Sequence, residues 1–142
     1  MDVIGTMGRI VLSRRRFQTE ALRPFGITFM QFHLIALARR RGALRPSDAA
    51  AELSCDRPTA SVIAENCVAQ GWLVRRRSAS DRRSRRLLLT GEGEELLDRI
   101  EAAQVLSPRD GDPLDALDEA EKEAFLVSLE LVMRRAEGLF GA

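Results

Sequence analysis

The spacing of apolar residues along the chain predicts a mainly helical protein with one short β-hairpin. Apolar positions recur every three or four residues in six stretches, which is the period of an amphipathic helix. The expected helices cover residues 3–22, 29–41, 47–53, 57–70, 91–106 and 115–139. Two short apolar runs, Trp72–Val74 and Leu87–Leu89, flank an arginine-rich polar segment, which is typical of the two strands of a hairpin.

Residues that favour helix starts and ends agree with this division. Thr28 followed by Gln31 matches a capping box at the start of the second helix, and Gly42 follows its end. Asp56 and Thr90 each stand directly before a predicted helix, where a side-chain oxygen can cap the first backbone N–H groups. The expected boundaries therefore rest on local chemistry as well as on periodicity.

The two short helices on either side of Ser54–Asp56 fit a helix-turn-helix. On the second of them, residues 57–70, the small and apolar side chains recur on one face and are expected to point inward. The residues left on its outer face are Arg57, Thr59, Ser61, Val62 and Asn66. This outer face is the first candidate for contact with a partner.

Charge is divided unevenly along the chain. Residues 1–91 contain 17 Lys+Arg against 7 Asp+Glu, a net charge of +10, whereas residues 92–142 contain 5 against 14, a net charge of −9. The hairpin stretch 72–90 has seven arginines against one acid, Asp81. Arginine suits bidentate contact with phosphate and with guanine edges, so the hairpin is a candidate for binding a polyanion. A solvated charged loop is the alternative interpretation.

Several short motifs occur in a defined order along nearly the whole chain. They are Leu22–Gly26, Ile27–Thr28, Gln31, Leu34, Leu37, Ala49–Ala50, Leu53, Thr59–Ser61, Gly71–Arg75, Asp81–Ser84, Leu89–Thr90 and Gly93. Together they resemble the MarR family of winged-helix transcriptional regulators, and the spacing from Gly71 to Arg83 is the most specific part. The chain departs from that family at Val62 and Asn66, where a basic residue is frequent, and at Cys67, where leucine is usual.

The resemblance implies a winged helix-turn-helix: a mainly α protein with a small β-hairpin wing, formally α+β. It implies one domain over residues 1–142, with the winged core and a connecting helix at 28–106. Residues 1–27 and 107–142 are then expected to be dimerisation helices, and the broad apolar stripe of the last helix favours the same interpretation. The implied function is sequence-specific binding of double-stranded DNA by a homodimer, commonly a repressor of a pseudo-palindromic operator that a small-molecule effector releases.

The outer face of the 57–70 helix supplies the candidate major-groove contacts. Thr59, Ser61 and Asn66 are candidates for base edges, and Asn66 could equally be a solvated helix residue. Val62 is a candidate for contact with a thymine methyl group. Arg57 is expected to hold a phosphate.

The hairpin supplies the candidate minor-groove and backbone contacts. Arg83 matches the family arginine that enters the minor groove, where a narrow A·T-rich groove attracts positive charge. Asp81 is expected to brace Arg83. Arg82, Arg85 and Arg86 are expected to contact the DNA backbone.

Two further candidate sites have ordinary structural roles as their alternatives. An effector pocket would be lined by Phe17, Met30, His33 and Leu34, for which core packing is the alternative. Cys55 lies beside the start of the 57–70 helix, where a thiolate could be stabilised, so a thiol-based redox-sensing regulator is a second hypothesis. A small residue that fills a turn is the alternative for Cys55.

Other function classes are disfavoured by what the sequence does not contain. It has no G-x-S-x-G motif, no P-loop and no plausible Cys–His–acid set, so no enzyme is expected. One histidine and two cysteines do not make a metal site, and no cofactor is expected. No apolar run approaches the ~20 residues of a membrane span and no signal peptide is recognisable, so we expect a cytoplasmic protein. A winged helix that binds only other proteins is the remaining alternative.

Overall fold

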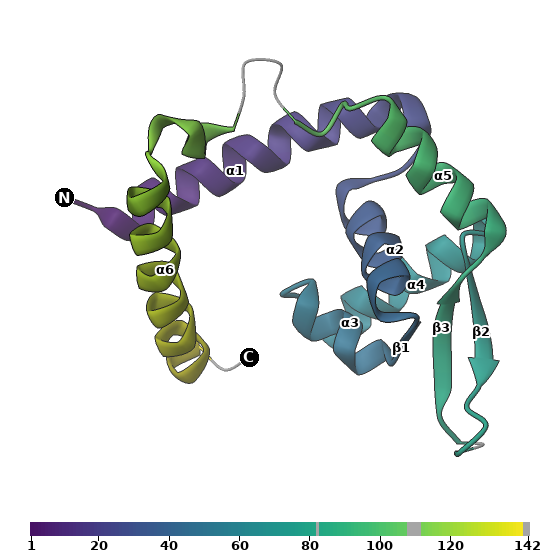
Figure 1. The fold of residues 1–142 in the computed structure, drawn as a ribbon. Helices are drawn as coiled ribbons and strands as arrows, with labels where there is room; N and C mark the ends of the chain where they lie inside the picture. Colours follow the sequence, from purple (N-terminus) through teal and green to yellow (C-terminus); the bar gives the residue numbers. More distant parts are fainter. Residues whose placement is uncertain (82, 108–111, 141–142) are drawn as a thin grey trace. The chain divides into compact units, whose positions relative to one another are not determined.

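The structure, a computed structural model, describes residues 1–81, 83–107 and 112–140. The chain divides into two compact units, Met1–Leu106 and Ser107–Ala142. The first unit combines helices with a small antiparallel sheet, which confirms the predicted mainly α class with a hairpin wing (Figure 1). Its elements are α1 (Val3–Leu22), η1 (Arg23–Phe25), α2 (Phe29–Arg41), β1 (Ala43–Leu44), α3 (Pro46–Glu52), α4 (Arg57–Ala69), β2 (Leu73–Arg77), β3 (Arg85–Leu89) and α5 (Gly91–Ala102).

Most helix boundaries of the first unit agree with the prediction to within one residue, because capping is a local interaction. The capping box of α2 is present: Gln31 N donates to Thr28 Oγ1 at 3.2 Å, and Thr28 N donates to Gln31 Oε1 at 3.0 Å. Gly42 ends α2 with a φ of +80°, a conformation that favours glycine. The exception is α5, which ends at Ala102 rather than residue 106. The chain turns there through Gln104, whose φ is +51°.

The helices α3 and α4 form the predicted helix-turn-helix, and alanines fill the space between them and the core. Ala49 and Ala50 on α3 and Ala60 and Ala64 on α4 are all buried. Helices can approach closely where the side chains at their contact are small. The α2 helix packs on α4 and α5, and it supplies several of the fully buried side chains of the core. The largest fully buried side chains are Leu22, Leu34, Ile35, Leu44, Leu73, Leu87, Leu97 and Ile100.

The sheet has three strands in the order β1–β3–β2, all antiparallel. The two-residue strand β1 was not predicted, because two residues are too few to show an alternating pattern. Its Ala43 pairs with Leu88. The hairpin strands also extend beyond the predicted apolar runs into the arginines, as far as the pair Arg77 and Arg85. Backbone hydrogen bonds form whatever the side chains are, so apolar runs underestimate strand length. Trp72, predicted to be in a strand, precedes β2.

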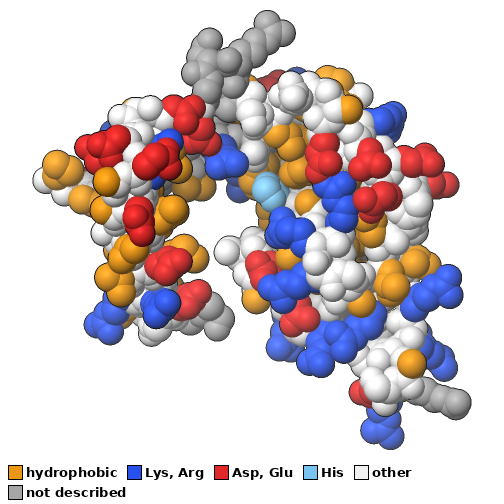
Figure 2. Space-filling view, viewed as in Figure 1, with side chains coloured by type: hydrophobic (Ala, Val, Ile, Leu, Met, Phe, Trp, Pro, Cys, Tyr) orange, Lys and Arg blue, Asp and Glu red, His pale blue; other side chains and the backbone are white. Residues whose placement is uncertain are grey.

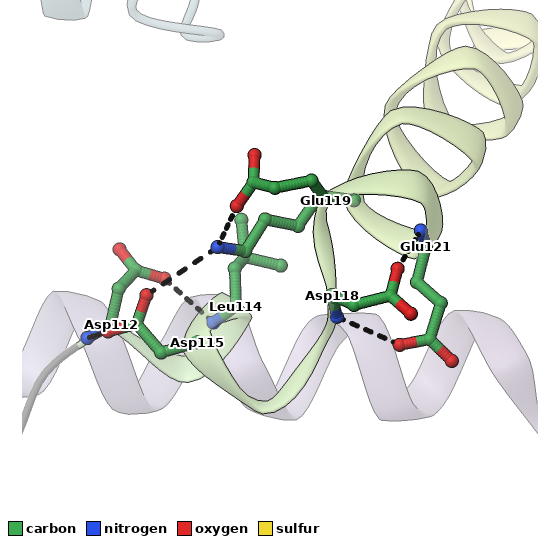
Figure 3. A network of polar contacts seen from close by, with 7 residues as sticks. Asp112, Leu114, Asp115, Asp118, Glu119 and Glu121 are labelled. Atoms are coloured by element: carbon green, nitrogen blue, oxygen red, sulfur yellow. Dashed lines mark hydrogen bonds and ion pairs between the residues drawn. The ribbon is translucent and has the colours of Figure 1, made fainter.

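The second unit contains the 3-10 turn η2 (Pro113–Ala116) and the helix α6 (Glu119–Phe140). The predicted helix at 115–139 is therefore split, because carboxylates cap both elements (Figure 3). Asp118 Oδ1 accepts from Glu121 N and Glu121 Oε2 accepts from Asp118 N, both at 2.9 Å, which begins α6 at Glu119. At η2 the Asp112 carboxylate accepts from Leu114 N, and Asp112 N donates to the Asp115 carboxylate, both at 2.8 Å. Of the residues between the predicted helices 91–106 and 115–139, those at 108–111 lie outside the described residues.

Both α1 and α6 carry large apolar side chains that are exposed in the single chain. The exposed apolar residues of α1 are Val3, Ile4, Ile10, Val11, Leu12 and Phe17, and those of α6 are Phe125, Leu126, Val127, Leu131, Val132, Met133, Leu139 and Phe140. Among the helices that the structure describes, none is by itself long and apolar enough to cross a membrane. Only Val3–Phe25 and Phe29–Arg41 taken together, with a bend of 82° between them, meet that test of length and composition.

Candidate nucleic-acid interface

The outer face of α4 has the composition that the periodicity predicts. Arg57, Thr59, Ser61, Val62 and Asn66 are all exposed. The opposite face buries Ala60, Ala64 and Cys67, so the helix cannot rotate without exposing core residues. The structure thus brings the five predicted contact residues of this helix onto one accessible surface.

Thr59 has a second role, as part of the cap that begins α4. Asp56 accepts two hydrogen bonds from it, one from the backbone N–H at 2.7 Å and one from the hydroxyl at 2.9 Å. The backbone bond, followed by the hydroxyl bond, lowers the pKa of Asp56 below its usual value. Since the Thr59 hydroxyl hydrogen is committed to Asp56, this hydroxyl is available to a base mainly as a hydrogen-bond acceptor.

The tip of the wing is shaped by backbone hydrogen bonds around Asp81. Its Oδ1 accepts from the backbone N–H of Arg83 at 2.9 Å, and its carbonyl accepts from Ser84 N at 3.0 Å. Ser78 N donates in turn to the carbonyl of Ser84 at 2.9 Å. Asp81 therefore holds the backbone of Arg83, whereas the guanidinium of Arg83 pairs with no carboxylate among the described residues.

The described arginines at the tip of the wing and on β3 differ in exposure. Arg83 and Arg85 are exposed, and Arg86 is partly buried. The predicted backbone contact at Arg82 lies outside the described residues. Basic side chains gather along the lower edge of this unit, over β1, α3 and the hairpin, while acidic side chains gather over α5 (Figure 2). The uneven charge along the sequence is therefore also a separation of charge on the surface of this unit.

Sequence reasoning missed an ion pair that joins α4 to the wing. Arg75 on β2 pairs with Glu65 on α4 through its Nη2 atom. Its Nε atom is buried and has no hydrogen-bond partner among the described residues. Glu65 and Arg75 are ten residues apart and lie in different elements, so neither periodicity nor a motif indicated their contact.

A concave surface of about 420 Å³ lies between the start of α3 and the wing. We call it the arginine groove, and its polar lining residues are Arg45, Ser47, Arg75, Arg83, Arg85 and Arg86, together with Ser84. Arg45, in the short connection between α2 and α3, and Ser47, in the first turn of α3, were not predicted as site residues, because no motif pointed to them. Only the pairing of β1 with β3 brings that connection beside the wing.

Two of the four residues predicted to line an effector pocket border the same concave site. A concave site of about 230 Å³ is lined by Phe29, Met30, His33, Leu37, Glu52 and Leu53. Met30 and His33 were predicted to line a pocket and do so. Leu34 instead lies in the core with no exposed surface, and Phe17 is an exposed residue of α1 that does not line this site. Leu34 points from α2 into the core cluster with Ile35 and Leu97, whereas His33 lies at the edge of this site.

His33 lies among aromatic and basic groups. Its ring centroid is 4.3 Å from that of Phe29 and 5.3 Å from that of Phe32. Burial lowers the pKa of His33 below its usual 6.5, and the positive charges of Arg14 and Arg40 lower it further. The neutral form of this imidazole is therefore favoured in the folded protein.

This direction of the pKa shift predicts a pH dependence of stability. Since the pKa of His33 is lower in the folded state, the unfolded state binds more protons as the pH falls below about 6.5. The stability that His33 contributes is present above its unfolded pKa and is lost as the pH falls through the folded pKa. We expect a larger loss of unfolding free energy between pH 7.5 and pH 5.5 in the wild type than in His33→Gln. Urea unfolding at both pH values measures it, and equal losses would contradict it.

The two cysteines have different surroundings. Cys67 is fully buried in the core, and burial raises the pKa of its thiol to about 12, so it is protonated and unreactive near neutral pH. Cys55 is partly exposed in the turn before α4, where its backbone N–H donates to the carbonyl of Ala50 at 3.1 Å. Among the described residues, no group of three or more His, Cys, Asp or Glu side chains is arranged to hold a metal ion.

Comparison with known proteins gives one family and one kind of fold. A model of the MarR family matches residues 25–84. The HTH-type transcriptional regulator PecS of Dickeya dadantii is 32% identical over 113 residues, which cover 78% of this chain and 68% of PecS.

Solved structures of the same fold cover almost the entire chain. The repressor CouR bound to a 23-mer DNA duplex has a TM-score of 0.75 at 24% identity, with 92% of each chain covered. CouR from Rhodococcus jostii RHA1 bound to p-coumaroyl-CoA has a TM-score of 0.76 at 20% identity, covering 99% of this chain and 94% of CouR. At these identities the likeness establishes the fold.

Proposed function

Since the chain belongs to the MarR family of transcriptional regulators, we propose that it binds a pseudo-palindromic DNA operator as a homodimer and represses transcription there. The family is one of regulators rather than enzymes, and we assign this chain no reaction and no cofactor. We place its action in the cytoplasm, where the operator would be found. A small-molecule effector is proposed to release it from DNA.

The observation that carries this proposal is the accessible face of α4 beside an arginine-rich wing. A helix of 13 residues is roughly 20 Å long, and the major groove, about 12 Å wide, admits an α-helix. Ser61 and Asn66 are proposed to contact base edges there, with Val62 against a thymine methyl group. Thr59 is proposed to accept a hydrogen bond from a base amino group. Arg57 is proposed to hold a phosphate.

The wing is proposed to enter the neighbouring minor groove through Arg83, whose backbone is held by Asp81. Narrow A·T-rich minor grooves attract arginine through their negative potential. Arg82, Arg85 and Arg86 are proposed to contact the backbone. In vitro selection of bound duplexes from a random pool tests the function as a whole, because it yields the site, its symmetry and the half-site spacing together.

Replacement of Arg83 by alanine is expected to weaken operator binding by about 1–3 kcal/mol, because a charge placed in a narrow groove is lost. Fluorescence anisotropy at a fixed salt concentration, with the selected operator, measures it. Arg99→Ala on α5 removes the same charge from an exposed position and serves as the control. An Arg83→Ala affinity equal to that of the control would remove the wing from the mechanism.

The dimer is proposed to form through residues 1–27 and 107–142, with residues 28–106 as the winged core and its connecting helix. The support is the set of large apolar side chains that are exposed on α1 and on α6, each within its own unit. Readers of pseudo-palindromic DNA need two copies related by a twofold axis. A purified protein that sediments as a monomer of 15.8 kDa at micromolar concentration would contradict this assignment.

The effector is proposed to bind the site lined by Phe29, Met30 and His33. Its aromatic and aliphatic lining suits a small, flat, largely apolar molecule, and Glu52 supplies one polar group. Two alternatives remain testable. Full operator binding after peroxide treatment would exclude redox sensing through Cys55. If the wild-type protein shows no salt-dependent binding to generic DNA, a winged helix that contacts only proteins is favoured.

A further inference from the structure

The arginine groove is a strongly basic concavity beside the two elements that are proposed to enter the DNA grooves. A helix in the major groove and a wing in the adjacent minor groove have one backbone strand between them. The surface between those two elements must therefore face that strand. The groove borders that surface: its described lining residues come from the start of α3 and from the hairpin rather than from α4, and Arg75 connects it to α4 through its ion pair with Glu65.

The charge of the groove fits a phosphodiester. Five arginines line it, and its lining contains no acidic side chain among the described residues. Of the five, only Arg75 forms an ion pair with a carboxylate in the part of the chain that the structure describes. Five like charges around one concavity repel each other, and an anion placed between them relieves that repulsion. The hydroxyls of Ser47 and Ser84 add donors of the kind that phosphate oxygens accept.

The same lining argues against a small apolar effector at this position. Pro46 and Leu87 are its only apolar members, and it contains no aromatic ring among the described residues. Apolar and aromatic side chains predominate in pockets for small ligands. The groove is also open rather than enclosed, which suits a strand that passes through it.

The fold fixes the position of Arg75 in the lining of the groove. It lies opposite Leu87 in the sheet register, and Leu87 is buried, so this position of β2 is fixed by the core. Its ion pair with Glu65 holds one edge of the guanidinium toward α4. Arg45 lines the groove from the α3 side, because the strand β1, which ends directly before it, pairs with β3.

We propose that the arginine groove holds the DNA backbone strand between the two grooves, with Arg45 and Arg75 as phosphate-binding residues. This inference rests on the proposed DNA-binding function and adds residues outside α4 and the wing tip. Both contacts read charge rather than sequence, so they support binding to every duplex alike.

The test uses the full chain and the variants Arg45→Gln and Arg75→Gln, with Arg99→Gln as the matched loss of charge. Anisotropy titrations with the selected operator and with a scrambled duplex are repeated at several salt concentrations. We expect Arg45→Gln to lower the binding affinity for both duplexes equally, by roughly tenfold. The slope of log affinity against log salt is expected to fall in magnitude by about one. Arg75→Gln is expected to do the same, provided that circular dichroism shows it folded.

Arg45 is exposed, so its variant decides the matter even if Arg75→Gln does not fold. An Arg45→Gln protein that binds both duplexes as Arg99→Gln does would overturn the proposal while leaving the DNA-binding function intact. A loss confined to the operator would also overturn it, because that result indicates a base contact. A wild type that binds no duplex would refute the proposed function itself, and this inference with it.

Discussion

Replacement of Gly93 by alanine is expected to destabilise the fold by about 3 kcal/mol, although alanine is the better helix former. A Cβ atom at this position would lie 2.4 Å from the carbonyl oxygen of Trp72 and 2.5 Å from Cδ1 of Leu89. The carbonyl is backbone and cannot rotate away. It also accepts the hydrogen bond of Thr90 N at 3.0 Å, so its displacement would loosen the cap that begins α5.

Thermal unfolding followed by circular dichroism measures this effect, and a Tm lower by at least about 10 °C is expected for a unit of this size. Gly91→Ala is the matched control, since it lies two residues earlier in α5 and its added Cβ would meet nothing within 4 Å. The control is expected to be neutral or slightly stabilising. Equal Tm values for the two variants would show that α5 does not pack against the start of β2 as described.

Replacement of Leu34 by alanine is expected to cost about 2–5 kcal/mol of unfolding free energy. Its side chain has no exposed surface and lies in the core cluster with Ile35 and Leu97. Removal of three carbon atoms leaves a cavity that the surrounding α2, α4 and α5 can close only in part. The cost therefore includes the lost burial of apolar surface and the lost contacts of the neighbouring side chains.

Met30→Ala is the comparison for Leu34→Ala, because Met30 is on the same helix but is only partly buried and lines the site near His33. Urea unfolding of both variants measures the difference, and Met30→Ala is expected to cost clearly less. If Leu34→Ala were the milder change and instead altered effector response, Leu34 would belong to a ligand site after all.

The residues proposed to touch DNA differ in how the sequence indicated them. Arg57, Ser61 and Asn66 were predicted from the period of α4 alone, because the buried alanines opposite them leave one orientation. Arg83 and Asp81 were predicted from motif spacing, and the structure adds that Asp81 acts on the backbone of Arg83. Arg45 lay outside both kinds of reasoning.

Two predicted roles changed once the tertiary contacts were known. Leu34 was grouped with His33 as a pocket residue, yet its side chain is fully buried in the core and does not line the site near His33. Thr59 was expected only to contact a base, yet its hydroxyl is bonded to Asp56. In both cases the sequence shows which side chains are available but not which neighbour each one meets.

The sequence by itself determined the helices, their caps, the hairpin, the exposed face of α4 and the family, because these depend on residues within a few positions of each other. Only the tertiary structure decided the strand β1, the Glu65–Arg75 ion pair, the arginine groove and the close approach at Gly93. Each of these joins segments that are separate in the chain. Their contact depends on how the core side chains pack together, which no local pattern of residues encodes.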